Sequence, residues 1–494
     1  MGGDAMSKYD TNNFIGSQTS LNEFTRSILL SLNTSEPQKE IIHLDGKWFR
    51  AEQYLDMINR IRTHLLSYSI DPKSVLAIVG KKNIENLALI VAAWSLNYSL
   101  LILPVRASTE FQNHLLSSSD AFLIEIDSEQ NLYIKRSGAT HSDSEDTGLL
   151  LPTSGTTGVP KLVKITFQGM MNFAKWARTI LPTGTSCRVL SYAPLNFDLS
   201  LLEVWSPLIA GGRVVVADES KMTHSAYLRK LIEEQQVNVL QGVSGLYRTL
   251  LQGSSSSLNY IKLTIITGEK FPLSLVHQII KLLPGSKLMN IYGSTETNDS
   301  FVAILDKEKL SSIETLPIGQ RLPGVEFTID LSHDHDKGEL LVHTPFMSAG
   351  YCDKNKTAEK FFTDEHGRRW FRTGDLASVN NNGELQLHGR IDHQIKVDGV
   401  RINLSDIEMV LLLHPDIRAA VVWARVNDLG ENRVTAVINT INSKDISPLS
   451  LRKYCSEHLP TAAIPKRMWI TDEEIPLGNN GKYDTAKLEL IYGG

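Results

Sequence analysis

The chain has 494 residues, of which 42% are hydrophobic and 21% are charged, and its formal net charge is −5. This length and composition predict a globular protein with two or more packed cores, and the mildly acidic balance argues against binding to nucleic acid or to an anionic membrane surface. The three cysteines lie far apart and form no CxxC pair, which argues against a disulfide framework or a structural zinc site and favours a reducing cytoplasm.

The N-terminal stretch, residues 1–20, is polar and lacks the basic and apolar regions of a secretory signal. The most apolar run, residues 87–105, is broken by Asn97, Tyr98 and Ser99 and contains Pro104. We therefore expect a buried helix followed by a buried strand here, and no transmembrane segment.

Short apolar strands alternate with amphipathic helices along much of the chain, which predicts α/β layering with mostly parallel sheets. The expected strands span residues 74–79, 100–105, 188–192, 212–216, 237–241 and 263–267, and the expected helices span residues 83–95, 167–180 and 227–235. From Gly338 the pattern changes to short strands with turns, at residues 338–343 and 383–387. Beyond Asp392 we expect a small α+β unit with helices at 404–413 and 448–458, the second capped by Ser447, and strands at 419–425 and 434–439.

A run of hydroxyl residues and glycines, residues 151–161, interrupts this pattern and reads LPTSGTTGVPK. Its glycines let backbone N–H groups turn toward an anion, its hydroxyls add donors, and Lys161 adds a positive charge, so the run is suited to holding phosphate. The alternative is an ordinary solvated loop. The run is not the P-loop of common NTPases, because the GxxxxGK[ST] spacing is absent.

Further along, Tyr292 to Thr297 places an aromatic ring, hydroxyls and a carboxylate at the end of an expected strand, where open α/β sheets bind ligands. In that setting Tyr292 would stack on a base and Glu296 would hold a magnesium ion. On its own, such a segment is more often a helix cap.

Three more clusters follow in the second half of the chain. Asp375 follows a Thr-Gly turn and is placed to accept hydrogen bonds from ribose hydroxyls, Gly389 to Arg401 mixes charge with glycine, and Lys482 stands at the tip of a Gly/Asn turn. Each of them, taken singly, also fits an ordinary turn or a solvated connector.

Taken together and in this order, the clusters resemble those of the adenylate-forming superfamily, which comprises acyl-CoA synthetases, aryl acid ligases, luciferases and nonribosomal peptide synthetase adenylation domains. The resemblance runs from about Leu44 to Leu488 and rests on TSGTTGVPK, YGSTET, GELLVHTPFMSAGY, FRTGDL, GRIDHQIKVDGVRI and NGK. It implies ATP-dependent activation of a carboxylate as an acyl-AMP, followed by transfer to a thiol, with ATP and Mg²⁺ as cofactors. It also implies a large N-terminal part of layered sheets and helices, residues 1–390, and a small mobile α+β C-terminal lid, residues 391–494, that rotates about Asp392.

The resemblance assigns roles residue by residue. The catalytic residues are Lys482, Thr295 and Glu296, with Glu296 also the magnesium ligand. The nucleotide-binding residues are Thr153, Ser154, Gly155, Thr156, Thr157, Gly158, Lys161, Gly268, Glu269, Tyr292, Gly293, Ser294, Asp375 and Arg390. Among these, Tyr292 would stack on adenine and Lys482 would screen the substrate carboxylate from the α-phosphate.

The chain departs from the superfamily pattern at three positions. Leu162 stands where glycine is usual, Phe167 where histidine is frequent, and Asn403 where glutamate is common. The first two leave the phosphate donors intact, whereas Asn403 lies in the loop that would meet the thiol.

The segment around Asp198 indicates which acid is activated, because Phe197-Asp198 resembles the amino-acid-activating adenylation domains, whose aspartate pairs with the substrate ammonium. Such a charged hydrogen bond contributes ~1.5–3 kcal/mol. The alternative is that Asp198 caps a helix beginning at Leu199. Matching the remaining pocket positions gives Leu199, Leu202, Gln241, Ile265, Thr267, Ile291, Asp299 and Ser300, a partly polar set that does not name the amino acid.

The function predicted from these residues is activation of an amino acid as aminoacyl-AMP and its transfer to the phosphopantetheine thiol of a separate carrier protein, in specialised peptide or natural-product biosynthesis. We expect a carrier acting in trans because the sequence ends shortly after Lys482 without a phosphopantetheine site. The alternatives are an acyl- or aryl-CoA ligase, or a non-catalytic nucleotide-binding relative.

Overall fold

The computed structural model describes residues 21–105, 107–138, 146–153, 161–252, 256–308, 310, 313, 316–331, 337–380, 384–391, 394–427, 430–440, 446–473, 475–476 and 485–492. The expected phosphate-binding residues 154–158, the expected hinge Asp392 and the expected catalytic Lys482 lie outside these ranges.

In the part of the chain that the structure describes, the first sheet has seven strands in the order β18-β8-β7-β4-β3-β5-β6. β5, β3, β4 and β7 pair in parallel, and β8 returns antiparallel against β7 with Thr153 opposite Lys161. The strands are β3 (Val75–Val79), β4 (Ser99–Leu103), β5 (Phe122–Ile126), β6 (Leu132–Arg136), β7 (Thr147–Thr153), β8 (Lys161–Thr166) and β18 (Gly350–Tyr351). The hydroxyl-rich run therefore joins two adjacent strands of this sheet.

The second sheet has nine strands within the described ranges, in the order β15-β14-β13-β12-β11-β9-β10-β1-β2. Its central strands are parallel, so their carboxyl ends share one edge, and antiparallel strands flank them on both sides. The strands are β1 (Glu40–Leu44), β2 (Lys47–Arg50), β9 (Arg188–Ser191), β10 (Arg213–Val216), β11 (Val239–Gly242), β12 (Leu263–Thr267), β13 (Lys287–Ser294), β14 (Asn298–Ile304) and β15 (Gln320–Arg321).

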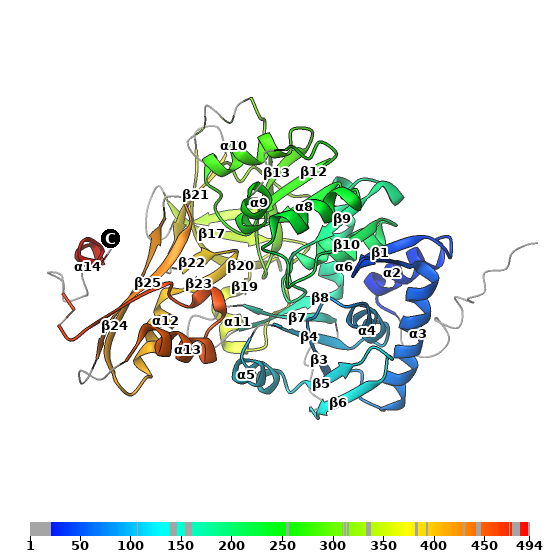
Figure 1. Ribbon diagram of the computed structural model, residues 1–494, viewed down its shortest axis with the longest axis horizontal. Coiled ribbons are helices and arrows are strands. Elements are labelled where there is room, and N and C mark those ends of the chain that lie inside the picture. The colour runs from blue at the N-terminus through cyan, green and yellow to red at the C-terminus, as the bar shows by residue number, and fades with distance from the viewer. Residues whose placement is uncertain are drawn as a thin grey trace, which may run out of the picture.

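Helices cover the faces of these two sheets (Figure 1). They are α2 (Glu23–Asn33), α3 (Ala51–Ser67), α4 (Ile84–Ser95), α5 (Thr109–Ser119), α6 (Phe167–Ile180), α7 (Ser206–Ile209), α8 (Ser225–Glu234), α9 (Ser244–Leu251) and α10 (Leu273–Leu282), with short turns η1 (Gly184–Ser186) and the π-helical η2 (Leu201–Trp205). The helix expected at 167–180 is confirmed; the Thr166 side chain caps it by accepting a hydrogen bond from the Gly169 N–H, at 2.9 Å.

The apolar run at 87–105 forms most of α4 and the whole of β4, which confirms the expected buried helix and strand. Leu100 and Ile102 face the main core of the N-terminal part, whereas Leu101 and Leu103 face a second core that includes α5. A strand buried on both faces is apolar throughout, as this one is. Within the described ranges, no helix is long and apolar enough to cross a membrane.

Among the described residues, a third sheet has five strands, which fall between residues 326 and 390 of the sequence. It contains β16 (Glu326–Asp330), β17 (Gly338–His343), β19 (Phe361–Thr363), β20 (Arg369–Val379) and β21 (Leu385–Arg390), and α11 (Lys354–Lys360) precedes β19. All of its pairings are antiparallel.

The C-terminal part is smaller and has its own apolar core, formed by residues such as Ile407, Ala436 and Leu451. It lies on one side of the molecule, in orange and red (Figure 1). Its elements are β22 (Gln394–Val397), β23 (Val400–Asn403), α12 (Leu404–Leu412), β24 (Ile417–Val426), β25 (Asn432–Thr440), α13 (Pro448–His458), η4 (Thr461–Ala463), β26 (Arg467–Thr471) and α14 (Thr485–Tyr492). Ser447 caps α13 as expected, and the α/β fold class with a small α+β C-terminal part is confirmed.

Candidate functional site

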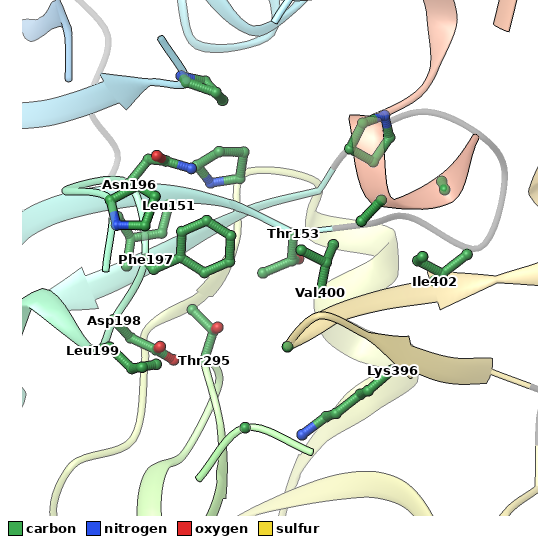
Figure 2. Close-up of a pocket in the computed structure, with 18 of the residues that line it drawn as sticks. Leu151, Thr153, Asn196, Phe197, Asp198, Leu199, Thr295, Lys396, Val400 and Ile402 are labelled. Atoms are coloured by element: carbon green, nitrogen blue, oxygen red, sulfur yellow. The ribbon is translucent and has the colours of Figure 1, made fainter. Parts of the chain in front are cut away.

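A cavity of approximately 540 Å³ opens where the carboxyl ends of the second sheet meet the C-terminal part. Its wall combines the ends of β12 and β13, the segment after β9, and residues of β22, β23 and η4. Ligands of open α/β sheets bind at this edge of the strands. Figure 2 shows the cavity with Asp198 and Thr295 on one side and Lys396, Val400 and Ile402 on the other.

Asp198 lies in the cavity wall, and its carboxylate accepts hydrogen bonds from the Thr295 side chain and the Leu199 backbone N–H. Burial raises the pKa of Asp198, whereas these hydrogen bonds and the positive charge of Lys396 oppose the rise. The helical segment after it begins at Leu201, and Asp198 does not cap it. The structure therefore supports the interpretation of Asp198 as a cavity carboxylate over the helix-cap alternative.

Glu203 lies buried beneath the Asp198 segment and was not singled out by the sequence. One of its carboxylate oxygens accepts hydrogen bonds from the N–H groups of Tyr192 and Ala193, each at 2.8 Å. Burial raises the pKa of Glu203 and lowers that of Lys82, and the attraction between their charges opposes both shifts. Lys82 also donates to the Ser191 carbonyl at 3.0 Å, so this buried pair supports the segment that leads to Asp198.

Glu296 is buried in the cavity wall, and one carboxylate oxygen accepts a hydrogen bond from the Tyr351 hydroxyl at 2.7 Å. Mg²⁺ is commonly held by one or two carboxylates together with substrate phosphates. Glu296 fits that role, because its carboxylate is held in orientation beside the cavity. Within the described ranges, no three Asp, Glu, His or Cys side chains gather as a protein-only metal site.

Asp375 and Arg390 face the cavity from the adjacent strands β20 and β21 and form an ion pair, with Arg390 Nη1 to Asp375 Oδ1 at 2.7 Å. The Tyr292 hydroxyl donates to the other oxygen of Asp375. The Tyr292 ring packs against the Phe301 ring, with their centroids 5.9 Å apart. Tyr292 is not among the residues that line the cavity. Stacking of Tyr292 on a base therefore stays a prediction. In this structure the Tyr292 hydroxyl orients the Asp375 carboxylate through their hydrogen bond.

Gly268 lines the cavity but its neighbour Glu269 does not. The Glu269 carboxylate accepts hydrogen bonds from the backbone N–H groups of Ser244, at 2.8 Å, and Gly399, at 3.3 Å. Burial raises its pKa, and these hydrogen bonds oppose the rise. Glu269 therefore joins the N-terminal part to the loop between β22 and β23, a role that the sequence did not indicate.

Thr153 and Lys161 are the described ends of the expected phosphate-binding run. Thr153 lines the cavity, whereas Lys161 is buried beside it, with Nζ 5.3 Å from the centre of the Tyr351 ring. Gly293, Ser294 and the catalytic candidate Thr295 also line the cavity. The structure thus brings the flanks of the predicted nucleotide site together around one space.

The predicted side-chain pocket is reproduced only in part. Leu199, Thr267 and Asp299 line the cavity together with Asp198. Five other predicted positions are buried behind the described wall and do not line it: Leu202, Gln241, Ile265, Ile291 and Ser300. Gln241 donates to the carbonyl of Leu199, the neighbouring cavity residue, at 3.1 Å. For these five residues the structure does not support direct contact with a substrate in this arrangement.

Lys396 of β22 is a cavity residue that the sequence marked only as part of a charged segment. It reaches the cavity from the C-terminal part (Figure 2), and its charge acts on Asp198. Lys396 and Asp198 are almost 200 residues apart in the sequence, so no local sequence pattern indicated that they share a cavity.

The fold and the cavity together define an α/β protein with a candidate site between a large and a small part of the chain. The sequence matches the AMP-binding enzyme family over residues 120–352 and the AMP-binding enzyme C-terminal domain over residues 406–482. The chain belongs to this adenylate-forming family of ligases.

Individual relatives agree with this assignment. The chain is 31% identical over 394 residues to tyrocidine synthase 3 of Brevibacillus parabrevis, which covers 76% of this chain and 6% of that synthase. It is 30% identical over 352 residues to a D-alanine–D-alanyl carrier protein ligase of Bacillus cereus, covering 69% of each. The chain thus spans only a small fraction of the length of the peptide synthases it matches.

Among solved structures, the amide bond synthetase McbA from Marinactinospora thermotolerans superposes with a TM-score of 0.81 over 95% of this chain and 99% of that chain, at 21% identity. At this identity the similarity establishes the fold alone.

Proposed function

We propose that the protein activates an amino acid as aminoacyl-AMP and transfers it to the phosphopantetheine thiol of a separate carrier protein, in the biosynthesis of a specialised peptide or related product. The observation that carries this proposal is the carboxylate of Asp198 in the wall of the cavity, hydrogen-bonded to Thr295. A buried carboxylate at this position favours a substrate that brings a positive charge and disfavours an acid without an amino group.

The chemistry has two steps. A carboxylate oxygen of the amino acid attacks the α-phosphorus of ATP and pyrophosphate leaves, and then the thiol sulfur attacks the acyl carbon and AMP leaves. Asp375 and Arg390 would orient the ribose, and residues 153–161 with Lys161 would hold the phosphates. Glu296 would be the chain's own ligand for Mg²⁺, which neutralises phosphate charge when bound. Lys482 would screen the approach of the two anions in the first step.

The carrier as acceptor is supported by the carrier protein ligase that is 30% identical to the chain. It is also consistent with the lining of the cavity, to which the C-terminal residues Leu459, Pro460 and Ala462 contribute apolar surface beside Phe111. The methylene groups of a phosphopantetheine arm would pack against such apolar surface.

Amino-acid-dependent ATP–pyrophosphate exchange, measured over a panel of amino acids, fatty acids and aryl acids, tests the proposal. We expect exchange with one or a few amino acids and none with their deaminated analogues. Exchange only with acids that lack an amino group would overturn the proposal in favour of an acyl- or aryl-CoA ligase. Absence of AMP release with every acid would indicate a non-catalytic relative. Loading of a phosphopantetheinylated carrier, compared with free coenzyme A, identifies the acceptor.

A further inference from the structure

Asp299 is held close to the activation chemistry by a tight turn. β13 and β14 pair antiparallel, with Gly293 opposite Asp299. A Cβ atom at Gly293 would lie 2.2 Å from the Asn298 carbonyl oxygen, so the strands approach each other here as closely as glycine allows. The turn between them carries Thr295 and Glu296, and Asp299 returns from it into the wall of the same cavity.

The Asp299 carboxyl group has no hydrogen-bonding or charged partner among the described residues, unlike the carboxyl groups of its neighbours in the cavity wall. Asp375 is paired with Arg390, and Glu296 is bound by Tyr351. Within the described ranges, the Asp299 carboxyl group forms no hydrogen bond or ion pair, while the Asp299 backbone N–H donates to the Asn298 side chain at 2.8 Å. Burial, together with the negative charge of Asp198, raises the pKa of Asp299 to about 8.

A carboxyl group in a cavity wall that has no partner in the protein is costly to ionise unless a ligand supplies its partner. The cavity already offers Asp198 for one ammonium group, and Lys396 of the C-terminal part acts on Asp198 and not on Asp299. A second positive charge on the substrate would offset the desolvation cost of ionised Asp299 and its repulsion from Asp198.

The depth of the cavity limits where that second charge sits. Of the predicted side-chain positions, Leu199, Thr267 and Asp299 line the space with Asp198, whereas Gln241, Ile265 and Ile291 are buried and do not line it. A side chain that reached past this wall would displace buried Ile265 or Ile291, so the second charge lies close to the Cα atom of the substrate.

We propose that the amino acid carries a second amino group on a short side chain, with its α-ammonium paired to Asp198 and its side-chain ammonium paired to Asp299. This inference rests on the amino acid activation proposed above.

The wild-type enzyme provides the first test, through ATP–pyrophosphate exchange with matched pairs of substrates. 2,3-Diaminopropionate is compared with 2-aminobutyrate, and 2,4-diaminobutyrate with norvaline, because each pair differs by an ammonium in place of a methyl group. Serine and homoserine serve as neutral polar probes, and lysine as a long cationic one. We expect kcat/KM to be at least about tenfold higher for one of the short diamino acids than for its isostere, the value of a charged hydrogen bond.

Preference for serine, homoserine or an apolar amino acid would overturn the inference while leaving amino acid activation intact. Preference for lysine would overturn the claim that the side chain is short. Exchange with no amino acid at all would instead contradict the proposed function. The outcomes of the two proposals are thus distinguishable.

Asp299→Asn provides the second test, with Asp306→Asn as the matched control because Asp306 lies exposed just beyond the same strand. We expect Asp299→Asn to lower the ratio of kcat/KM for the diamino acid to kcat/KM for its monoamino isostere roughly 10- to 150-fold. A cooperative thermal transition shows that the variant is folded. An equal loss for both substrates would contradict the pairing of Asp299 with the second ammonium.

Discussion

Arg248 of α9 and Glu431, in the turn before β25, form an ion pair between the N-terminal and C-terminal parts, with Arg248 Nε 2.6 Å from Glu431 Oε1. Their side chains are 19% and 12% exposed, so solvent screens the pair only in part. Beside it, Gly430 lies so close to Pro272 that a Cβ atom there would be 2.6 Å from the proline ring. Together with the hydrogen bond from Gly399 to Glu269, these contacts hold the C-terminal part with Lys396 at the cavity.

Arg248→Ala should weaken the contact between the N-terminal and C-terminal parts and slow the transfer of the acyl group to the thiol. If the rotation implied by the family resemblance brings the Gly399 loop to the thiol, thiol transfer should fall roughly fivefold, the effect of about 1 kcal/mol, while adenylate formation changes little. Single-turnover measurements of the two half-reactions test this, with Lys230→Ala as control because Lys230 forms an exposed pair with Glu234. An equal fall in both half-reactions would show that the Arg248 pair supports folding alone.

Lys482→Ala should abolish adenylate formation and leave ATP binding nearly unchanged, because the lysine acts on charge that develops as the carboxylate meets the α-phosphate. Exchange kinetics and equilibrium binding of ATP, measured on the same preparation, check this. If the affinity for ATP and the exchange rate fell together, the assignment of Lys482 to the transition state would be wrong.

Asp198→Asn should lower kcat/KM for the preferred amino acid by roughly 10- to 150-fold, corresponding to ~1.5–3 kcal/mol for a charged hydrogen bond. The deaminated analogue of the same acid is the control substrate, because it has no ammonium to lose. Any activity toward that analogue should stay unchanged or rise. A variant as active as the wild type would argue for an acyl- or aryl-CoA ligase.

Asp299 should make the free enzyme less stable as pH rises. Its folded-state pKa is raised to about 8 from the ordinary value of 3.8, so between these pH values the folded state holds a proton that the unfolded state has released. The free energy of unfolding therefore decreases with increasing pH across this window, by roughly 1.4 kcal/mol per pH unit for this one group. Above about pH 8 the loss is complete.

Asp299→Asn removes that dependence, so its Tm should exceed that of the wild type more at pH 8 than at pH 5. Thermal unfolding at the two pH values checks the prediction. A saturating cationic substrate should narrow the difference in Tm between variant and wild type, because it binds and stabilises the folded wild type. A constant difference in Tm would show that Asp299 does not titrate in this window.

The sequence alone indicated the family and much of the local structure. The helices at 167–180 and 448–458 begin directly after Thr166 and Ser447, and the side chains of these two residues cap the helices. The strand at 263–267 and the apolar run at 87–105 were also predictable from the sequence. Capping and apolar patterning both depend on residues that are only a few positions apart. The clusters around Glu296 and Asp375 were recognisable for the same reason, since their residue types stand together in the chain.

Tertiary structure decided which of these residues share a space. Lys396 reaches the cavity that contains Asp198, Glu269 binds Gly399 instead of lining the cavity, and Ile265 and Ile291 lie behind its wall. These relationships join residues far apart in sequence, and they depend on how β22 and β23 pack against the ends of the parallel strands. No local pattern encodes the depth of a cavity or the partner of a buried charge, because both are set by the packing of whole sheets and helices against one another.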